Sequence, residues 1–290
     1  MRIKAYAKVN LVLDVLRRLE NGYHEVRMVM QSVDLADILT IEKNTRGIIN
    51  ITTNVEGLEC DENNLIYKAA KRILAEAQTE QGFDIHLEKN IPIAAGMAGG
   101  STDAAATLVG INRMLNLGFD VDKLKEIAVT IGADVPYCIE GGTQLSEGIG
   151  EKLTHLNGAP DCHILIAKPH IGVSTKYVYE NLHVDRIIKH PDVDGMLKAI
   201  DNKDPRAVAD KLDNILETVT AKEYPQIGRL EDIMKENGAM NAIMSGSGPT
   251  VFGLFEERSV AERALAAVEE SGLAAQALVT GFANANCEEL

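Results

Sequence analysis

Residues 92–105 read Pro92-Ile-Ala-Ala-Gly-Met-Ala-Gly-Gly-Ser-Thr-Asp-Ala-Ala105, which sets three glycines directly before a predicted helix. The helix is indicated by apolar residues at helical spacing, namely Ala104, Leu108, Ile111 and Leu115. Ser101 and Thr102 fall where its N-cap is expected. A loop without Cβ atoms lets backbone N–H groups approach an anion closely, and the first helical turn adds unpaired donors. The stretch therefore predicts a phosphate-binding loop.

A glycine run before a helix is also typical of an ordinary turn, so the motif by itself leaves both interpretations open. Its surroundings favour the nucleotide site, because Phe83, Ile85 and Leu87 alternate as in a strand and complete the order strand, loop, helix. Two familiar nucleotide motifs fit less well. The chain has no G-x-x-x-x-G-K-[ST] stretch, and its G-x-x-G-G spacing differs from the G-x-G-x-x-G of dinucleotide folds. A dinucleotide-binding oxidoreductase is therefore a weak alternative.

The composition limits the class of protein. A chain of 290 residues with 46% hydrophobic and 25% charged residues is globular and long enough for two packed domains. Its formal charge of −14 argues against nucleic acid as a partner, but a local site can still bind a small anion. The charged start and the lack of a long apolar run predict no signal peptide and no membrane span, so a cytoplasmic location is expected. Four cysteines without zinc or disulfide spacing are expected to be free thiols: Cys60, Cys138, Cys162 and Cys287.

The N-terminal residues alternate between apolar and polar side chains from Ile3 to Val15, which predicts a strand with one core face. Lys8 and Asn10 lie two residues apart on the opposite face of this strand. A lysine on the polar face of a strand is most often a solvated charge. Lys8 therefore gains a functional interpretation only if other polar groups converge on it.

Three other polar side chains stand where the backbone is constrained. Tyr23 and His24 come directly after an Asn21-Gly22 pair, which predicts a tight hairpin turn. Asp134 lies between a predicted helix end and a proline, so its side chain can be aimed at a fixed point. Taken alone, His24 would be a surface imidazole and Asp134 a turn or cap residue.

Runs of strands followed by helices occur twice, which favours an α+β chain over a doubly wound parallel sheet. The most linker-like segment is 154–161, so we expect an N-terminal domain over 1–157 and a C-terminal domain over 158–290. The stretch Ser245-Gly-Ser-Gly-Pro249 is predicted to join two strands, and its small residues also permit close approach to a ligand. Helix N-caps are expected at Asn63 or Asn64, at Asp120 or Asp122, at Asp204, and at Ser259 with Glu262 as its capping-box partner.

Three of these stretches together resemble the motifs of the GHMP kinase family: 7–11, 92–105 and 245–250. The further blocks 21–24, 132–136, 141–143 and 147–151 are similar to the members that phosphorylate the 2-hydroxyl of diphosphocytidyl methylerythritol in the non-mevalonate isoprenoid pathway. The resemblance runs in order along essentially the whole chain. It implies two α+β domains with the active site between them, ATP and Mg²⁺ as cofactors, a small-molecule substrate, and a monomer or homodimer.

The resemblance also implies roles for individual residues. It makes Lys8 and Asp134 catalytic, and it assigns Ser101 or Thr102 to magnesium. The residues implied to bind ATP are Pro92, Ile93, Ala94, Ala95, Gly96, Met97, Ala98, Gly99, Gly100, Ser101 and Thr102. Those implied near the substrate are Asn10, Tyr23, His24 and Tyr179, with Tyr179 favoured over Tyr177 as the second-half aromatic that holds the cytosine.

Two positions depart from the family pattern. Thr102 stands where the family loop commonly has serine, but it keeps the hydroxyl, so a contact with magnesium or phosphate is still expected. The family loop commonly has glycine where this chain has Ala98, and alanine would be strained there if its φ were positive. Two other functions remain open beside the one implied. Another GHMP kinase, of the homoserine or mevalonate type, shares the glycine loop but would not require the Asn21–His24 block. A sensor that binds a nucleotide without turnover would not require Lys8 and Asp134.

Overall fold

Two β-sheets form the frame of the computed structural model, which describes residues 1–290. In the first sheet the strands run in the order β12-β1-β2-β4-β3, with β5 and β6 continuing from β2 and β8 pairing with β1; in the second the order is β11-β7-β10-β9. The first sheet contains β1 (Arg2–Arg18), β2 (His24–Asn44), β3 (Ile49–Thr53), β4 (Gly82–Glu88), β5 (Thr143–Gly148), β6 (Lys152–His155), β8 (Asp213–Asn214) and β12 (Cys287–Glu289). The second contains β7 (His163–Pro169), β9 (Asn241–Met244), β10 (Val251–Phe255) and β11 (Ala274–Gly281).

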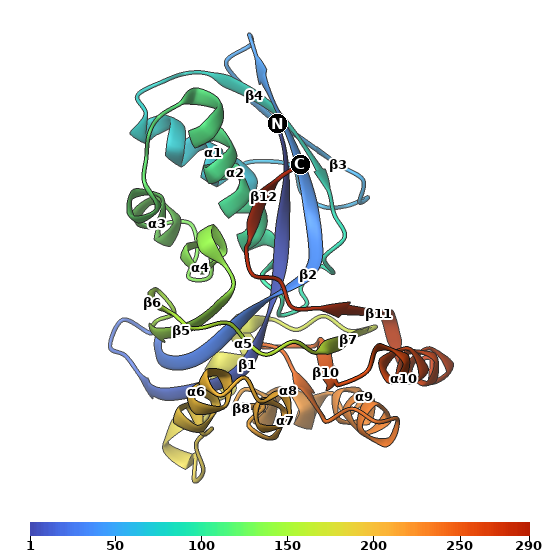
Figure 1. Cartoon of the computed structure of the whole chain (residues 1–290). Coiled ribbons are helices and arrows are strands. Elements are labelled where there is room, and N and C mark those ends of the chain that lie inside the picture. Colours follow the sequence, from blue (N-terminus) through green and yellow to red (C-terminus); the bar gives the residue numbers. More distant parts are fainter.

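The hairpin of β1 and β2 passes along both halves of the molecule (Figure 1). Its antiparallel register begins at Arg18 opposite His24, so the turn lies where the Asn21-Gly22 pair predicted it. Residues of β1 enter both hydrophobic cores: Ile3 and Ala5 belong to the larger one, and Val9 to the smaller. The long strand β1 is therefore shared by the two halves and fixes their relative position. Its polar side chains face the space where the two halves meet.

Helices cover the sheets in the mixed arrangement predicted for an α+β chain (Figure 1). Asn64, Asp120 and Asp204 cap their helices as expected, each accepting a hydrogen bond from a backbone N–H of the first turn. The helices are α1 (Leu65–Glu76), α2 (Gly99–Leu115), α3 (Val121–Val129), α4 (Val135–Glu140), α5 (Thr175–Asn181), the 3₁₀ turn η1 (Val184–Arg186), α6 (Val193–Asp201), α7 (Pro205–Asp210), α8 (Glu217–Glu223), α9 (Gln226–Glu236) and α10 (Arg258–Glu270). None of them combines the length and the apolar character that a bilayer crossing requires.

The capping box predicted at Ser259 and Glu262 is wrong. The N-cap of α10 is Glu257, and Ser259 lies inside the first helical turn. Glu262 forms an ion pair with Arg258 at 2.9 Å instead of reaching back to a backbone N–H. The i,i+4 attraction between these two side chains explains why the glutamate is drawn away from the capping position.

The C-terminal residues return to the N-terminal sheet. Strand β12 pairs with the free edge of β1, and the short β8 also pairs with β1. Just before β12, Asn286 is 1% exposed, and its Nδ2 donates to Thr102 Oγ1 at 2.9 Å and to the Cys138 carbonyl at 2.6 Å. The expected boundary between residues 157 and 158 falls between β6 and β7, yet residues beyond it complete the first sheet.

Candidate active site

One large cavity of about 1040 Å³ lies where the two halves meet. Residues from β1, from β2, from the glycine loop, from the segment before α4, from α5 and from the β9–β10 loop all line it. This volume stands at the upper end of the range for small-molecule sites. The cavity can therefore accommodate more than one ligand.

The glycine loop forms one wall of this cavity. Pro92 through Ser101 line it, and the loop leads directly into the N-terminus of α2. Gly96 has φ +72°, and a Cβ added there would lie 2.3 Å from the backbone oxygen of Ser245. The Ser245 hydroxyl in turn donates to the Gly96 carbonyl at 3.1 Å. The two glycine-rich stretches singled out in the sequence thus pack directly on each other.

Thr102 does not belong to this wall, so the expected contact of its hydroxyl with phosphate or magnesium is wrong. Its side chain is fully buried, and Oγ1 donates to the backbone oxygen of Tyr6 at 2.9 Å while accepting from Asn286. The expected N-cap at Ser101 or Thr102 is also wrong, because α2 begins at Gly99 and its N-cap is Ala98. Thr102 instead lies inside the helix, where its hydroxyl ties the start of α2 to β1.

Ala98 adopts the left-handed conformation, with φ 57° and ψ 25°. A Cβ in this region costs roughly 1–2 kcal/mol, which glycine avoids. Replacing Ala98 with Gly should therefore raise the free energy of unfolding by about 1 kcal/mol, after allowing for the greater freedom of glycine in the unfolded chain. Urea unfolding measures this change. Ala75→Gly on the exposed face of α1 is the matched control, and its free energy of unfolding should fall by about 1 kcal/mol. A loss of stability in Ala98→Gly would contradict the strain at this position.

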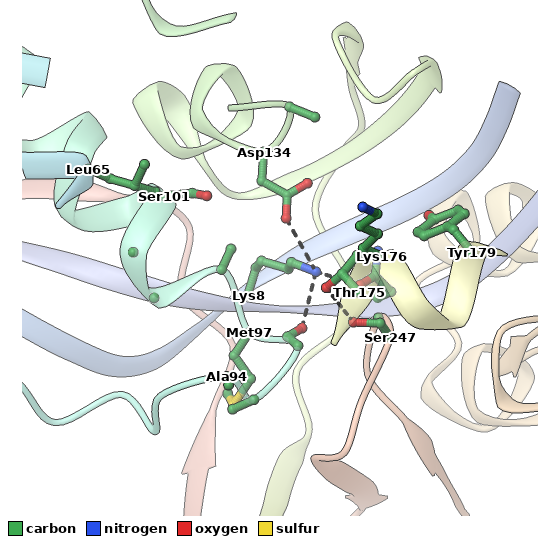
Figure 2. A pocket seen from close by; sticks show the side chains of 18 of the residues that line it. Lys8, Leu65, Ala94, Met97, Ser101, Asp134, Thr175, Lys176, Tyr179 and Ser247 are labelled. Carbon is green, nitrogen blue, oxygen red and sulfur yellow. Dashed lines mark hydrogen bonds and ion pairs between the residues drawn. The ribbon is translucent and has the colours of Figure 1, made fainter. Parts of the chain in front are cut away.

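Lys8 is the centre of a polar group at one end of the cavity (Figure 2). The residue is only 4% exposed, and its Nζ donates to Asn10 Oδ1 at 2.6 Å and to the Gly96 carbonyl at 3.2 Å. The same atom lies 4.0 Å from Asp134 Oδ2. A solvated surface lysine would show none of these contacts. Lys8 therefore joins the glycine loop, the strand and Asp134 at one point.

Asp134 occupies the N-cap position of α4, where Pro136 follows at the start of the helix. Its carboxylate makes no capping hydrogen bond, and about a third of the side chain is exposed. The carboxylate consequently faces the cavity beside Lys8 and is free to contact a ligand. Asn10 is more constrained, because its Nδ2 points to Met28 Sδ at 3.2 Å while its Oδ1 accepts from Lys8.

Aromatic rings gather at the other end of the cavity. His24 and Tyr179 lie with their ring centroids 5.2 Å apart at an interplanar angle of 37°, and Tyr23 beside them is 57% exposed. Burial and the nearby charge of Arg18 lower the pKa of His24, so its imidazole is neutral at pH 7 and offers one donor and one acceptor. Burial, reinforced by Asp134, raises the pKa of Tyr179, which keeps its phenol protonated. Tyr177 does not line the cavity.

Sequence reasoning missed several residues that the structure brings to the cavity. Thr175 Oγ1 and Ser247 Oγ are hydrogen-bonded at 2.8 Å and join α5 to the β9–β10 loop, and Lys176 stands next to them (Figure 2). The loop carrying Ser247 was recognised, but no local pattern indicates that α5 packs against it. The place of Thr175, Lys176 and Ser247 at the cavity depends on how these distant segments pack together.

A buried ionic cluster holds the start of the glycine loop in place. Lys89 Nζ pairs with Asp37 and, at 2.7 Å, with Asp103 Oδ2. Asp37 Oδ1 also accepts from the backbone N–H groups of Asn90 at 2.6 Å and Ile91 at 2.8 Å. The entry of the loop is thus bound to β2, and the start of α2 is bound to the same lysine. Burial raises the pKa of Asp103 well above its ordinary value.

Comparisons with known proteins agree with this geometry. Residues 64–142 match the family model described as the GHMP kinases N terminal domain, and residues 196–273 match that of the GHMP kinases C terminal domain. A protein of Lachnoclostridium phytofermentans named 4-diphosphocytidyl-2-C-methyl-D-erythritol kinase is 49% identical over 280 residues, which cover 97% of this chain and 96% of the relative.

Two solved structures extend the comparison. The crystal structure of a 4-(cytidine 5'-diphospho)-2C-methyl-D-erythritol kinase superposes with a TM-score of 0.81 at 31% identity, over 97% of this chain and 99% of the other. The homoserine kinase of Cytophaga hutchinsonii gives a TM-score of 0.82 at 21% identity, over 99% and 96% of the two chains. Backbone shape alone therefore does not separate these two activities, whereas sequence identity does.

Proposed function

The chain belongs to the GHMP kinase family, and on that premise we propose that its cavity binds ATP and phosphorylates the 2-hydroxyl of 4-diphosphocytidyl-2-C-methyl-D-erythritol. This reaction gives the 2-phosphate in the non-mevalonate isoprenoid pathway. Relatives that are 47% and 52% identical over most of this chain carry the name of the kinase for this substrate. The observation that carries the proposal is the presence of Lys8 and Asp134 at one end of a cavity whose other end holds His24 and Tyr179.

The end of the cavity that holds Lys8 and Asp134 is the transfer end. There Asp134 accepts the proton of the attacking hydroxyl as the new oxygen–phosphorus bond forms. The bond between the γ-phosphorus and the bridging oxygen breaks at the same centre, and ADP leaves. Such a transfer has a loose transition state, so the protein acts mainly by positioning and by stabilising charge. Lys8 holds the Asp134 carboxylate and offsets charge on the transferring group. The glycine loop and the first turn of α2 supply backbone N–H groups to the phosphates.

The residues present fit a magnesium ion that ATP brings with it. Mg²⁺ is typically held by one or two carboxylates or hydroxyls together with substrate phosphates, and no dedicated cage of protein ligands is needed. The structure contains no group of three His, Cys, Asp or Glu side chains that could hold a metal alone. Ser101 lines the cavity and would hold the ion together with the phosphates of ATP. When bound, the ion neutralises charge on the phosphates.

The end of the cavity that holds His24 and Tyr179 is the base end, because it receives the nucleobase. There the cytosine lies against the rings of Tyr23 and Tyr179, and His24 offers its polar edge to the cytosine. Replacing Tyr179 with Ala should remove stacking of roughly 1–3 kcal/mol. The KM for the cytidyl substrate should therefore rise about tenfold or more, while the KM for ATP stays nearly constant. Steady-state kinetics with each substrate varied in turn measure the two constants. Tyr177→Ala is the matched control on the same helix, and equal changes in both constants would argue against stacking by Tyr179.

Purified protein with Mg²⁺ and ATP tests the proposal when it is offered three alcohols: the diphosphocytidyl compound, homoserine and mevalonate. Product is identified by phosphorus NMR as well as by ADP release. Phosphorylation of the cytidyl compound alone is the expected result. Turnover of homoserine or mevalonate would show that the protein is a kinase, but it would refute the assignment of His24 and Tyr179 to a cytosine. Binding of ATP without turnover of any alcohol would favour the nucleotide sensor.

The setting of the reaction follows from two further observations. All four cysteines are unpaired, as is usual for proteins of a reducing compartment, which supports a cytoplasmic location. The cavity lies between the two halves of the chain, and we propose that the protein acts as a monomer or as a homodimer.

A further inference from the structure

We propose that Lys176 binds the diphosphate of the cytidyl substrate and so connects the base end of the cavity with the transfer end. The inference rests on the proposed function, because it concerns the part of that substrate which neither end accounts for. Diphosphocytidyl methylerythritol carries its diphosphate between the cytidine and the methylerythritol. With the base at His24 and Tyr179 and the hydroxyl at Asp134, the diphosphate must cross the space between them.

The helix α5 provides the side chains along this path. It begins after Ser174, whose hydroxyl accepts from the backbone N–H of Tyr177 at 3.4 Å. Lys176 and Tyr179 are three residues apart and share a helix face, and both line the cavity. Figure 2 shows the Lys176 side chain between the group of Lys8 and Asp134 on one side and the Tyr179 ring on the other. The ammonium group is therefore placed where the diphosphate has to pass.

The charges around the cavity leave Lys176 available for this contact. The other cations that line it are Lys8, Arg18 and Lys89. Lys8 is engaged with Asn10, Gly96 and Asp134, and Lys89 is held between two buried carboxylates. Arg18 lies opposite His24 in the register of β1 and β2, which assigns it to the base end.

Lys176 itself has one weak partner. Its Nζ lies 3.9 Å from Glu180 Oε1, and the two side chains are 82% and 57% exposed. An exposed pair of this kind contributes little and is easily exchanged for a stronger one. The Asp134 and Glu180 carboxylates would repel a diphosphate that had no cation beside it. A diphosphate between them thus gains most from the one lysine that is not already bound.

Lys176→Met tests the inference because it retains the alkyl stem and removes the charge. The KM for the diphosphocytidyl substrate should rise about tenfold, the effect of losing one charge-assisted contact, while kcat and the KM for ATP change less than twofold. Lys176→Arg should retain most of the affinity. Lys222→Met on α8 is the matched control, since that side chain is exposed and does not line the cavity.

Competition by cytidine diphosphate and by cytidine identifies the group that is bound. In Lys176→Met the inhibition constant of cytidine diphosphate should rise about tenfold, and that of cytidine should stay unchanged. Equal changes for both inhibitors, or no change for either, would overturn the role in diphosphate binding. A rise confined to the KM for ATP would assign Lys176 to the ATP phosphates and overturn it as well. Failure of the proposed function is distinct, because the wild-type protein would then not turn over the cytidyl substrate at all.

Discussion

Asp134→Asn is expected to lower kcat about 10³-fold while leaving the fold and ATP binding intact. Asparagine keeps the size and shape of the side chain but cannot accept the proton of the attacking hydroxyl, and a positioned general base typically contributes 10²- to 10⁴-fold. The carboxylate makes no capping hydrogen bond and is partly exposed, so α4 does not depend on it. Single-turnover kinetics measure the loss at the chemical step, and thermal unfolding measures the stability.

The control for this variant is Asp122→Asn, an exposed aspartate in the first turn of the neighbouring helix α3. It should leave kcat unchanged, because it lies outside the cavity. An Asp134→Asn protein that retains more than a tenth of the wild-type kcat would exclude this carboxylate as the base. A large fall in the melting temperature would instead assign it a structural role.

Lys8→Met is expected to lower kcat about 10²- to 10³-fold, the loss usual for removing one preorganised charge at the reacting group. The methionine fills most of the space but leaves Asn10 Oδ1 without its buried donor, which costs roughly 1–3 kcal/mol of stability. The Gly96 carbonyl retains the Ser245 hydroxyl as a donor, so the glycine loop keeps its position. Kinetics and urea unfolding together measure these two effects.

A second variant separates charge from structure at this site. In Lys8→Met with Asn10→Leu the stranded amide is gone, so stability should recover relative to Lys8→Met while kcat stays low. ATP affinity measured by calorimetry should remain within a few-fold of the wild type in Lys8→Met. If kcat recovers together with stability, Lys8 acts by supporting the structure and not by stabilising charge.

Features with a local signature could be predicted from the sequence. The hairpin turn at Asn21-Gly22, the caps at Asn64 and Asp120 and the chain order of strand, loop and helix around Gly96 all depend on neighbouring residues. The convergence of Lys8 on Asp134 came from the family resemblance. Nothing within either stretch indicates that Asp134, which lies 126 positions further along the chain, ends 4.0 Å from Lys8 Nζ.

Except at Ser259, where the competing Arg258 is a sequence neighbour, the errors arose where a distant residue decides the local structure. The expected N-cap of α2 at Ser101 or Thr102 is wrong, because Thr102 lies inside the helix and bonds to Asn286, which lies 184 positions further along the chain. The capping box at Ser259 failed because Arg258 competes for Glu262. Lys176, Thr175 and Ser247 were missed for a related reason, since they become neighbours only when α5 packs against the loop between β9 and β10.

The return of the C-terminal residues to the first sheet has a consequence for biosynthesis. On the ribosome, residues 1–157 emerge long before Asn286, so the nascent chain exposes an unpaired edge of β1 and an α2 without its anchor. Domains generally fold in the order in which they are made. Here the nucleotide-binding half can form its helices and hairpin early, but its ATP loop gains its final support only after Asn286 and β12 have left the exit tunnel. Full competence to bind nucleotide should therefore be acquired only once these residues have emerged.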